Sequence, residues 1–169
     1  LNMDFIKDAN MFMAYNDSND QRYNMPAIND FMTANNYGTA EWMTISNPSR
    51  GWNTPTNSKL LAAEVEGWLA NKDPANKTYY EQRYNDYAKS FDAIEPTESE
   101  KKQLNQTQVI VMLWQKDPVQ NWLGMNVVNI FAPEFALNGT KTAARVVDDI
   151  NSNPEKYQNV KYIIENMQS

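Results

Sequence analysis

Two consecutive long helices with no strand between them constrain the fold of this chain more than any other feature. Thr54 and Asp73 each stand directly before a proline, which is tolerated at the first position of a helix because the N–H it lacks would have no partner there. The pattern predicts helices over residues 55–71 and 74–94, each with a capping residue in front. Apolar and aromatic residues recur along them every three or four positions, at Leu61, Val65, Trp68, Leu69, Tyr80, Tyr84, Tyr87, Phe91 and Ile94.

Short apolar runs bounded by polar or turn residues flank the two helices on both sides. Runs of this kind are typical of strands, and they predict strands over residues 11–16, 42–46, 108–113, 127–131 and 161–165. Further helices are predicted over residues 26–35, 118–123 and 140–151. Alternation of apolar strands with helices is typical of the α/β class with mostly parallel pairing.

The central helices predict two lobes in place of one continuous sheet. We expect residues 1–72 to be part of an N-terminal α/β lobe, 73–104 to be a connecting helix and turn, and 105–169 to be part of a C-terminal α/β lobe. Thr97 and Glu100 have the spacing of a capping box, which predicts a short helix before the second lobe. The chain closes just after an apolar run, which would leave a sheet half built. We therefore expect an internal segment of a longer protein: two incomplete Rossmann-like lobes joined by a long helix.

The composition excludes several classes of function. Net charge is −6 without a cluster of Lys and Arg, whereas nucleic-acid binding takes most of its affinity from such clusters. The chain has no Cys and no His, so the thiol nucleophile and the commonest general base are both missing. No apolar run approaches the ~18 residues of a membrane span. The composition thus argues against an enzyme, against a nucleic-acid partner and against a membrane-spanning protein, so any association with a membrane would be peripheral.

Three stretches, taken in order, resemble a known family. They are "FIKDANMFMAYN", the central block from "NPSRGWNTP" to "NDYAKSFDAI", and "VNIFAPEFALNGTKTAARVVDDI". Together they are similar to the zinc and manganese receptors of ABC importers, the TroA-like metal-receptor superfamily. In that family a turn ending in Trp precedes a helix, a break follows, and a long helix then joins the two lobes. The resemblance covers nearly the whole chain, and it is carried by the shared order of the segments.

The resemblance implies an extracytoplasmic solute-binding protein. Its expected partners are a small solute and the membrane subunits of an ABC importer. The expected location is the periplasm or the cell surface, with a lipid anchor as one option on a segment outside this sequence. The alternative is a cell-surface interaction or adhesion module that keeps the fold without transport.

The metal ligands of the resembling family are not retained in this chain. Members hold metal between the lobes with a His from the first lobe, a His in the turn before Trp, a His or Glu from the second lobe, and a late carboxylate. Anchored on Trp52, the second place falls on Arg50, which has no lone pair to offer a cation. The second-lobe place falls within 113–115, where no usual metal ligand stands. We expect no cofactor, and a metal only if segments outside the sequence supply ligands.

Six residues are candidates for contact with the solute. In open α/β lobes ligands gather at the carboxyl ends of strands, and loops there carry binding residues. A guanidinium before Trp52 favours an organic anion or a chelate bearing carboxylates, because its planar fork suits bidentate pairing. Ordinary roles stay open for all of them, as surface charge, packing or a solvated strand end. The candidates are Arg50, Trp52, Trp114, Gln115, Asp117 and Glu165.

Two further patterns have structural interpretations. The 9 Met residues suggest copper binding, but adaptable core filler is the favoured interpretation, because six of them are scattered among apolar neighbours: Met3, Met11, Met13, Met25, Met32 and Met43. Asp148 and Asp149 are adjacent on a predicted helix and so point apart, which favours solvated carboxylates over a paired acid site.

Overall fold

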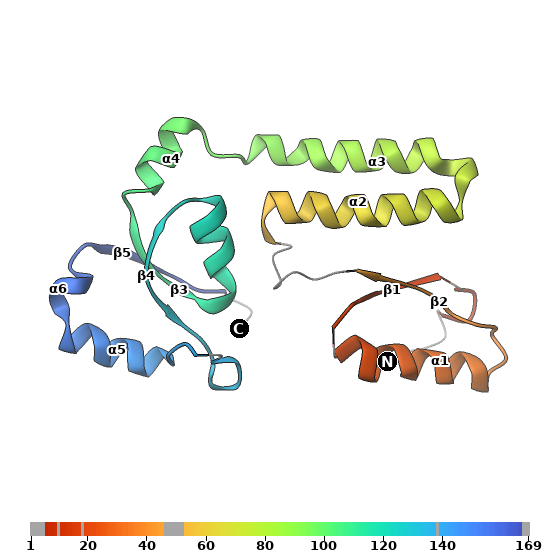
Figure 1. The fold of residues 1–169 in the computed structure, drawn as a ribbon, viewed down its shortest axis with the longest axis horizontal. Helices are drawn as coiled ribbons and strands as arrows, with labels where there is room; N and C mark the ends of the chain where they lie inside the picture. The colour runs from red at the N-terminus through yellow and green to blue at the C-terminus, as the bar shows by residue number, and fades with distance from the viewer. Residues whose placement is uncertain (1–5, 10, 18, 46–52, 138, 167–169) are drawn as a thin grey trace. The chain divides into compact units, whose positions relative to one another are not determined.

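The computed structural model describes residues 6–9, 11–17, 19–45, 53–137 and 139–166 (Figure 1). The chain divides into two compact units. The first comprises Leu1–Trp52 and Thr56–Lys89, and the second comprises Asn53–Pro55 and Ser90–Ser169. The break between Lys89 and Ser90 falls inside the proposed connector, residues 73–104, whereas Asn53–Pro55 belongs to the second unit although it lies within the predicted N-terminal lobe. The lobe boundaries themselves stay a prediction.

A βαβ arrangement opens the first unit. Strands β1 (Met11–Tyr15) and β2 (Glu41–Ile45) pair in parallel, and helix α1 (Met25–Ala34) follows a π-helical turn between them. The indole of Trp42 on β2 donates to Asn29 Oδ1 on α1 at 2.9 Å. This bond fixes α1 against one face of the two-stranded sheet.

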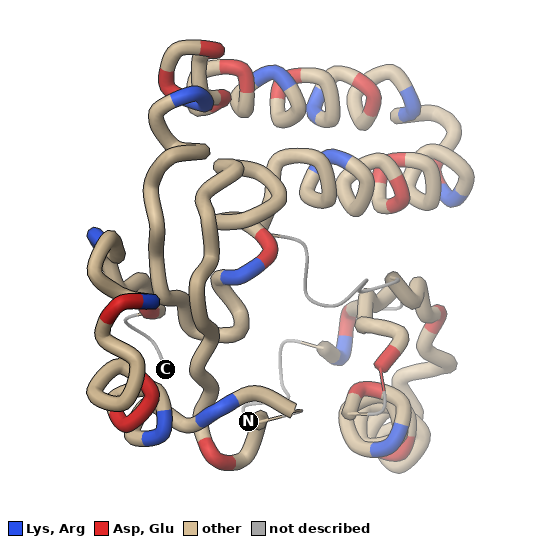
Figure 2. Tube along the Cα trace, turned by 60° about the vertical axis from the view of Figure 1, so that its left-hand side comes forward, with Lys and Arg blue, Asp and Glu red and all other residues tan. Residues whose placement is uncertain are grey.

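Helices α2 (Pro55–Lys72) and α3 (Lys77–Ser90) run side by side in both views (Figures 1 and 2). Acidic and basic residues are interspersed along both helices (Figure 2). No residue of α3 is fully buried. An apolar groove between the two helices is lined by residues of the predicted stripes, including Val65, Leu69, Tyr80, Tyr84 and Tyr87.

Asp73 does not make the predicted capping bond, and its side chain has other hydrogen-bond partners. Asp73 precedes a 3-10 turn, Pro74–Asn76, but its side chain accepts no capping bond from the backbone. Its carboxylate accepts instead from Asn76 Nδ2 at 2.7 Å and from the Tyr80 hydroxyl at 2.8 Å. These bonds, that from Asn76 first, hold the pKa of Asp73 below its usual value.

Three parallel strands form the sheet of the second unit. Their order is β4 (Asn126–Phe131), β3 (Gln108–Met112) and β5 (Val160–Ile164), so β3 lies in the middle. Parallel strands covered on both faces read as continuous apolar runs, as β3 does. Its residues from Val109 to Met112 are at most 2% exposed.

Helical elements cover both faces of this sheet. Val119, on the π-helical turn Pro118–Trp122, packs with Val109 and Val111. Val146 and Tyr157, on α5 (Ala143–Ser152) and α6 (Pro154–Tyr157), pack with Ile110 on the other side.

Helix α4 (Glu98–Leu104) leads into β3 and begins with the predicted capping box. Thr97 Oγ1 accepts from the amide of Glu100 at 3.3 Å, and the Glu100 carboxylate accepts from the amide of Thr97 at 2.8 Å. Both halves of the predicted box are therefore present.

The α/β prediction is confirmed, and each of the five strands lies within one residue of its predicted bounds. The five do not share one sheet. The methionine interpretation holds for Met32 and Met43, which are buried, and is wrong for Met11 and Met13, which are exposed on β1. Within the described residues, no helix is long and apolar enough to cross a membrane.

Candidate functional site

A cavity of about 420 Å³ opens at the carboxyl ends of the strands in the second unit. Met112 ends β3, Phe131 ends β4 and Glu165 directly follows β5, and all three residues line the cavity. Parallel strands bring their carboxyl ends to one edge of a sheet, which is where α/β folds bind ligands. The predicted position of Glu165 at a binding edge therefore coincides with an observed cavity.

Two kinds of charge meet in this cavity. Glu134 and Glu165 contribute carboxylates, and none of the described residues that line the cavity is a Lys or Arg. Thr142, Ala143 and Ala144 also line it, so the N-terminus of α5 faces the same space. Helix N-termini carry partial positive charge from their amide groups, which favours anions. Thr142 caps the helix by accepting the amide of Arg145 at 3.3 Å.

Glu134 lies on the loop between β4 and α5, which the structure describes at residues 132–137 and 139–141 and which is called here the cavity loop. Its ends are close, because the amide of Ala132 donates to the carbonyl of Lys141 at 2.9 Å. Phe131 and Lys141 also form an isolated parallel bridge. Within the loop the amide of Ala136 donates to the carbonyl of Pro133 at 2.9 Å. A compact surface loop with close ends is an Ω-loop, a type that is frequently functional.

Trp114 contacts the cavity loop through an aromatic side chain. It lies in the 3-10 turn that follows β3, Leu113–Gln115, and its ring packs on that of Phe135 with centroids 6.2 Å apart. Phe135 is 85% exposed and stands next to Glu134 in the chain. The predicted residue Trp114 is thus joined to the loop that carries a cavity carboxylate.

The carbonyl of Trp114 is also bonded to the first residue described after the predicted Trp turn. Asn53 Nδ2 donates to that carbonyl at 3.1 Å. Asn53 Oδ1 is buried and accepts no hydrogen bond from a described residue. Arg50 and Trp52, the candidates in that turn, lie outside the described residues.

Gln115 and Asp117 are not brought into the cavity. Neither lines it, and Asp117 Oδ1 instead accepts from Asn121 Nδ2 at 2.5 Å. Glu134, which sequence reasoning missed, does line it. Glu134 follows a predicted strand within a few residues, as Glu165 does, so the same argument applied to every strand would have found it.

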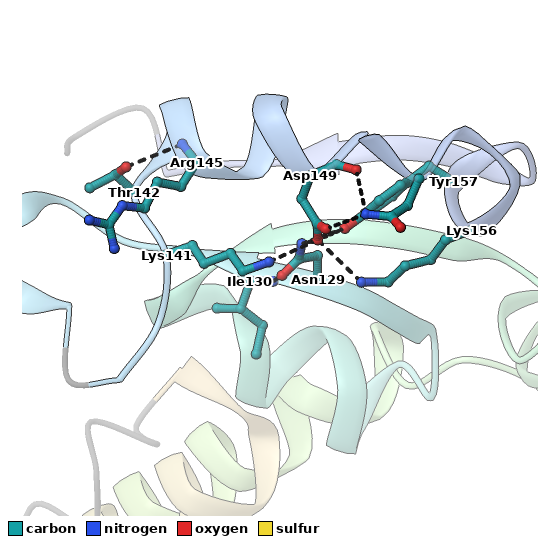
Figure 3. A network of polar contacts seen from close by, with 9 residues as sticks. Asn129, Ile130, Lys141, Thr142, Arg145, Asp149, Lys156 and Tyr157 are labelled. Carbon is teal, nitrogen blue, oxygen red and sulfur yellow. Dashed lines mark hydrogen bonds and ion pairs between the residues drawn. The ribbon is translucent and has the colours of Figure 1, made fainter. Parts of the chain in front are cut away.

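Asp149 lies at the centre of a polar network and is not a solvated surface acid (Figure 3). Its side chain is 16% exposed. Asp149 Oδ2 accepts from Lys141 at 2.9 Å, from Asn129 at 3.1 Å and from Lys156 at 3.3 Å, and also from the Tyr157 hydroxyl. The predicted solvation is therefore wrong for Asp149, whereas Asp148 is exposed.

The network changes the acidity of its members. The hydrogen bond from Tyr157, followed by that from Lys141, holds the pKa of Asp149 well below its usual range. The pKa of Lys156 is raised, chiefly by its bond to Tyr157 and then by that to Asp149. Both shifts favour the charged forms, so the network is an ion cluster at neutral pH.

The described residues contain no group of three or more His, Cys, Asp or Glu placed to hold a metal ion. Zinc sites take four N, S or O ligands, and manganese prefers hard oxygen donors with imidazole. Two cavity carboxylates alone fall short of such a set.

Residues 8–169 match the profile of the family described as zinc-uptake complex component A, periplasmic. Among solved structures, the chain is similar to a manganese-bound mutant of the periplasmic metal-binding protein from Candidatus Liberibacter asiaticus. That likeness has a TM-score of 0.57 and 14% identity, and it covers 95% of this chain and 61% of that one. The chain thus spans about 61% of the length of that protein. A comparison with curated proteins gave no match.

Proposed function

Because the chain belongs to the periplasmic zinc-uptake complex component A family, we propose that it is an extracytoplasmic receptor that delivers its solute to an ABC importer. The family consists of binding proteins, which agrees with the prediction that the chain is not an enzyme. Membership supports a metal as cargo, while the absence of His and Cys argues against a metal held directly by this chain.

The cavity of the second unit supports a metal chelate as the form of that cargo. Glu134 and Glu165 suit a positively charged group, and the N-terminus of α5 suits a negatively charged one. A metal complexed by a carboxylate-bearing chelator presents both charges on one small molecule. A bare metal ion would find too few ligands, and a simple organic anion would meet two carboxylates.

One observation carries this proposal: the two glutamates and the start of α5 line the same cavity at the carboxyl ends of the strands. Ligand pockets commonly combine an apolar lining with a few convergent polar groups. Met112 and Phe131 supply apolar lining here.

The test is calorimetric titration of the protein with Zn²⁺ alone and with zinc citrate. We expect Zn²⁺ alone to bind no tighter than about micromolar, and zinc citrate to bind at least about tenfold tighter. Glu165→Gln and Glu134→Gln should each weaken binding of zinc citrate by about 1.5 to 3 kcal/mol, the contribution of a charged hydrogen bond.

Glu155→Gln is the matched control, because Glu155 is an exposed glutamate of the same unit that does not line the cavity. If Glu155→Gln and Glu165→Gln lose the same affinity for zinc citrate, the cavity is not the binding site. A nanomolar site for Zn²⁺ alone would contradict the chelate. Binding of neither form would leave a cell-surface interaction module on the same fold as the better account.

A further inference from the structure

Lys141 joins the end of the cavity loop to the polar network around Asp149. It stands at the last position of the loop, directly before Thr142, which caps α5. Its carbonyl accepts from Ala132 at the other end of the loop, and its ammonium donates to Asp149 at 2.9 Å (Figure 3). One residue therefore both closes the loop and ties it to the body of the unit.

Asp149 is itself held from several elements. Asn129 on β4 and Tyr157 on α6 donate to Oδ2, and Asn153 Nδ2 donates to Oδ1 at 2.9 Å. A carboxylate bonded on both oxygens by residues of a strand, of a helix and of the junction between α5 and α6 has little freedom to move. It gives the ammonium of Lys141 a fixed point outside the loop.

We propose that the ion pair of Asp149 and Lys141 is a clamp that sets the position of the cavity loop, and with it the position of Glu134. Neither member of the pair lines the cavity, so both are positioning residues and not contacts of the solute. The effect on solute affinity rests on the proposed function. The effect on the loop does not.

Lys156 provides a matched control within the same network. It donates to the same oxygen of Asp149, at 3.3 Å, and its side chain is 45% exposed, as is that of Lys141. It lies on α6 and not on the cavity loop. In either Met variant the carboxylate of Asp149 loses one positively charged partner. Only Lys141→Met is expected to release the loop.

Hydrogen exchange followed by mass spectrometry tests the clamp without any solute. In Lys141→Met, amides of residues 132–141 should exchange about tenfold faster than in the parent chain, because local opening becomes easier. In Lys156→Met they should exchange at the parent rate, and Lys141→Arg, which keeps the charge, should restore most of the protection. Equal exchange in the two Met variants would overturn the clamp.

Titration with zinc citrate tests the link to binding. Lys141→Met should lose affinity in the same direction as Glu134→Gln, while Lys156→Met should keep the parent affinity. Full affinity in Lys141→Met, with the loop shown to be released, would overturn the role of the clamp in positioning Glu134. If the parent chain binds no zinc citrate, the proposed function fails, and the exchange result still decides the clamp.

Discussion

The ring of Trp114 packs on the ring of Phe135 with the two planes inclined by 40° and the centroids 6.2 Å apart. The first residue follows β3 and the second lies on the cavity loop, so the pair links two segments at the carboxyl edge of the sheet. Offset or tilted aromatic pairs of this kind are favourable beyond the area they bury. The contact also accounts for an exposed phenyl ring beside a cavity carboxylate.

Phe135→Ala should expose Trp114 and weaken the attachment of the cavity loop by about 0.5 to 1.5 kcal/mol, the usual contribution of an aromatic pair. The measurement is tryptophan emission, which should shift to longer wavelength. Since the chain has 5 Trp, the shift must disappear in a Trp114→Phe background. Tyr162→Ala, at another exposed aromatic of the same unit, should leave the emission unchanged. A shift that persists without Trp114 would contradict the pairing.

Ile110→Ala should lower the free energy of unfolding by about 2 to 5 kcal/mol, because it leaves a cavity in the centre of the sheet. Ile110 is 2% exposed, while its register partner on β5, Ile163, is 65% exposed. Ile163→Ala should therefore change stability by no more than about 0.5 kcal/mol. Urea denaturation, followed through the unfolding of the second unit, compares the free energies of unfolding of the two variants. A cost for Ile163→Ala as large as that for Ile110→Ala would mean that β5 is covered in solution.

Features that depend on neighbours in the chain could be predicted from the sequence. From Val109 to Met112 the strand β3 is a continuous apolar run, and the capping box of Thr97 and Glu100 is a spacing of three residues. Each needs only local information, since strand burial and helix capping leave short-range patterns. The α/β class followed from the alternation of such elements.

Features assembled from distant residues could not be predicted in the same way. Asp149 was expected to be solvated, because its partners Lys141, Asn129 and Tyr157 come from a loop, a strand and another helix. Asp73 was expected to cap a helix through the backbone, and Tyr80, seven residues on, accounts for part of the difference. A carboxylate accepts hydrogen bonds from whichever donors the fold brings close to it, and local sequence patterns do not show which of these donors will be near.

Thr97→Ala should destabilise the second unit by about 0.5 to 2 kcal/mol, the usual cost of losing an N-cap hydroxyl. The hydroxyl of Thr97 accepts from the amide of Glu100 and donates to the Glu100 carboxylate, so the variant loses both of these bonds. The bond from the amide of residue 97 to that carboxylate does not need the hydroxyl. Thermal unfolding provides the measurement. Ser99→Ala, two positions into the same helix, should be neutral or slightly stabilising, because alanine has the higher helix propensity. Equal destabilisation by both changes would show that the cap is not the cause.

Arg50→Ala should weaken binding of zinc citrate by about 1.5 to 3 kcal/mol while leaving binding of Zn²⁺ alone unchanged. The expectation rests on the sequence, in which Arg50 precedes the turn residue Trp52, and on the fit of a guanidinium to a carboxylate. Calorimetry with the two forms of the metal separates the effects. Arg145→Ala, at an exposed arginine of α5, is the control. Loss of Zn²⁺ and zinc citrate binding to the same extent would show that Arg50 does not recognise the chelator.

Asp149→Asn should flatten the dependence of stability on acid pH. The native pKa of Asp149 lies below the value of about 3.9 in an unfolded chain, so its ion pairs stabilise the fold fully above that value. The contribution is lost as the pH falls from about 4 toward the lowered native pKa, while Lys141 and Lys156 stay charged throughout. Urea denaturation between neutral pH and about pH 2.5 should show a shallower decline in the variant over that window.

Asp73 and Glu100, whose pKa values are also lowered, contribute equally to both proteins and cancel in the comparison. Asp148→Asn, which removes the adjacent exposed carboxylate, should keep the slope of the parent chain. If Asp149→Asn and Asp148→Asn decline in parallel with the parent, the network does not contribute to stability through the charge of Asp149.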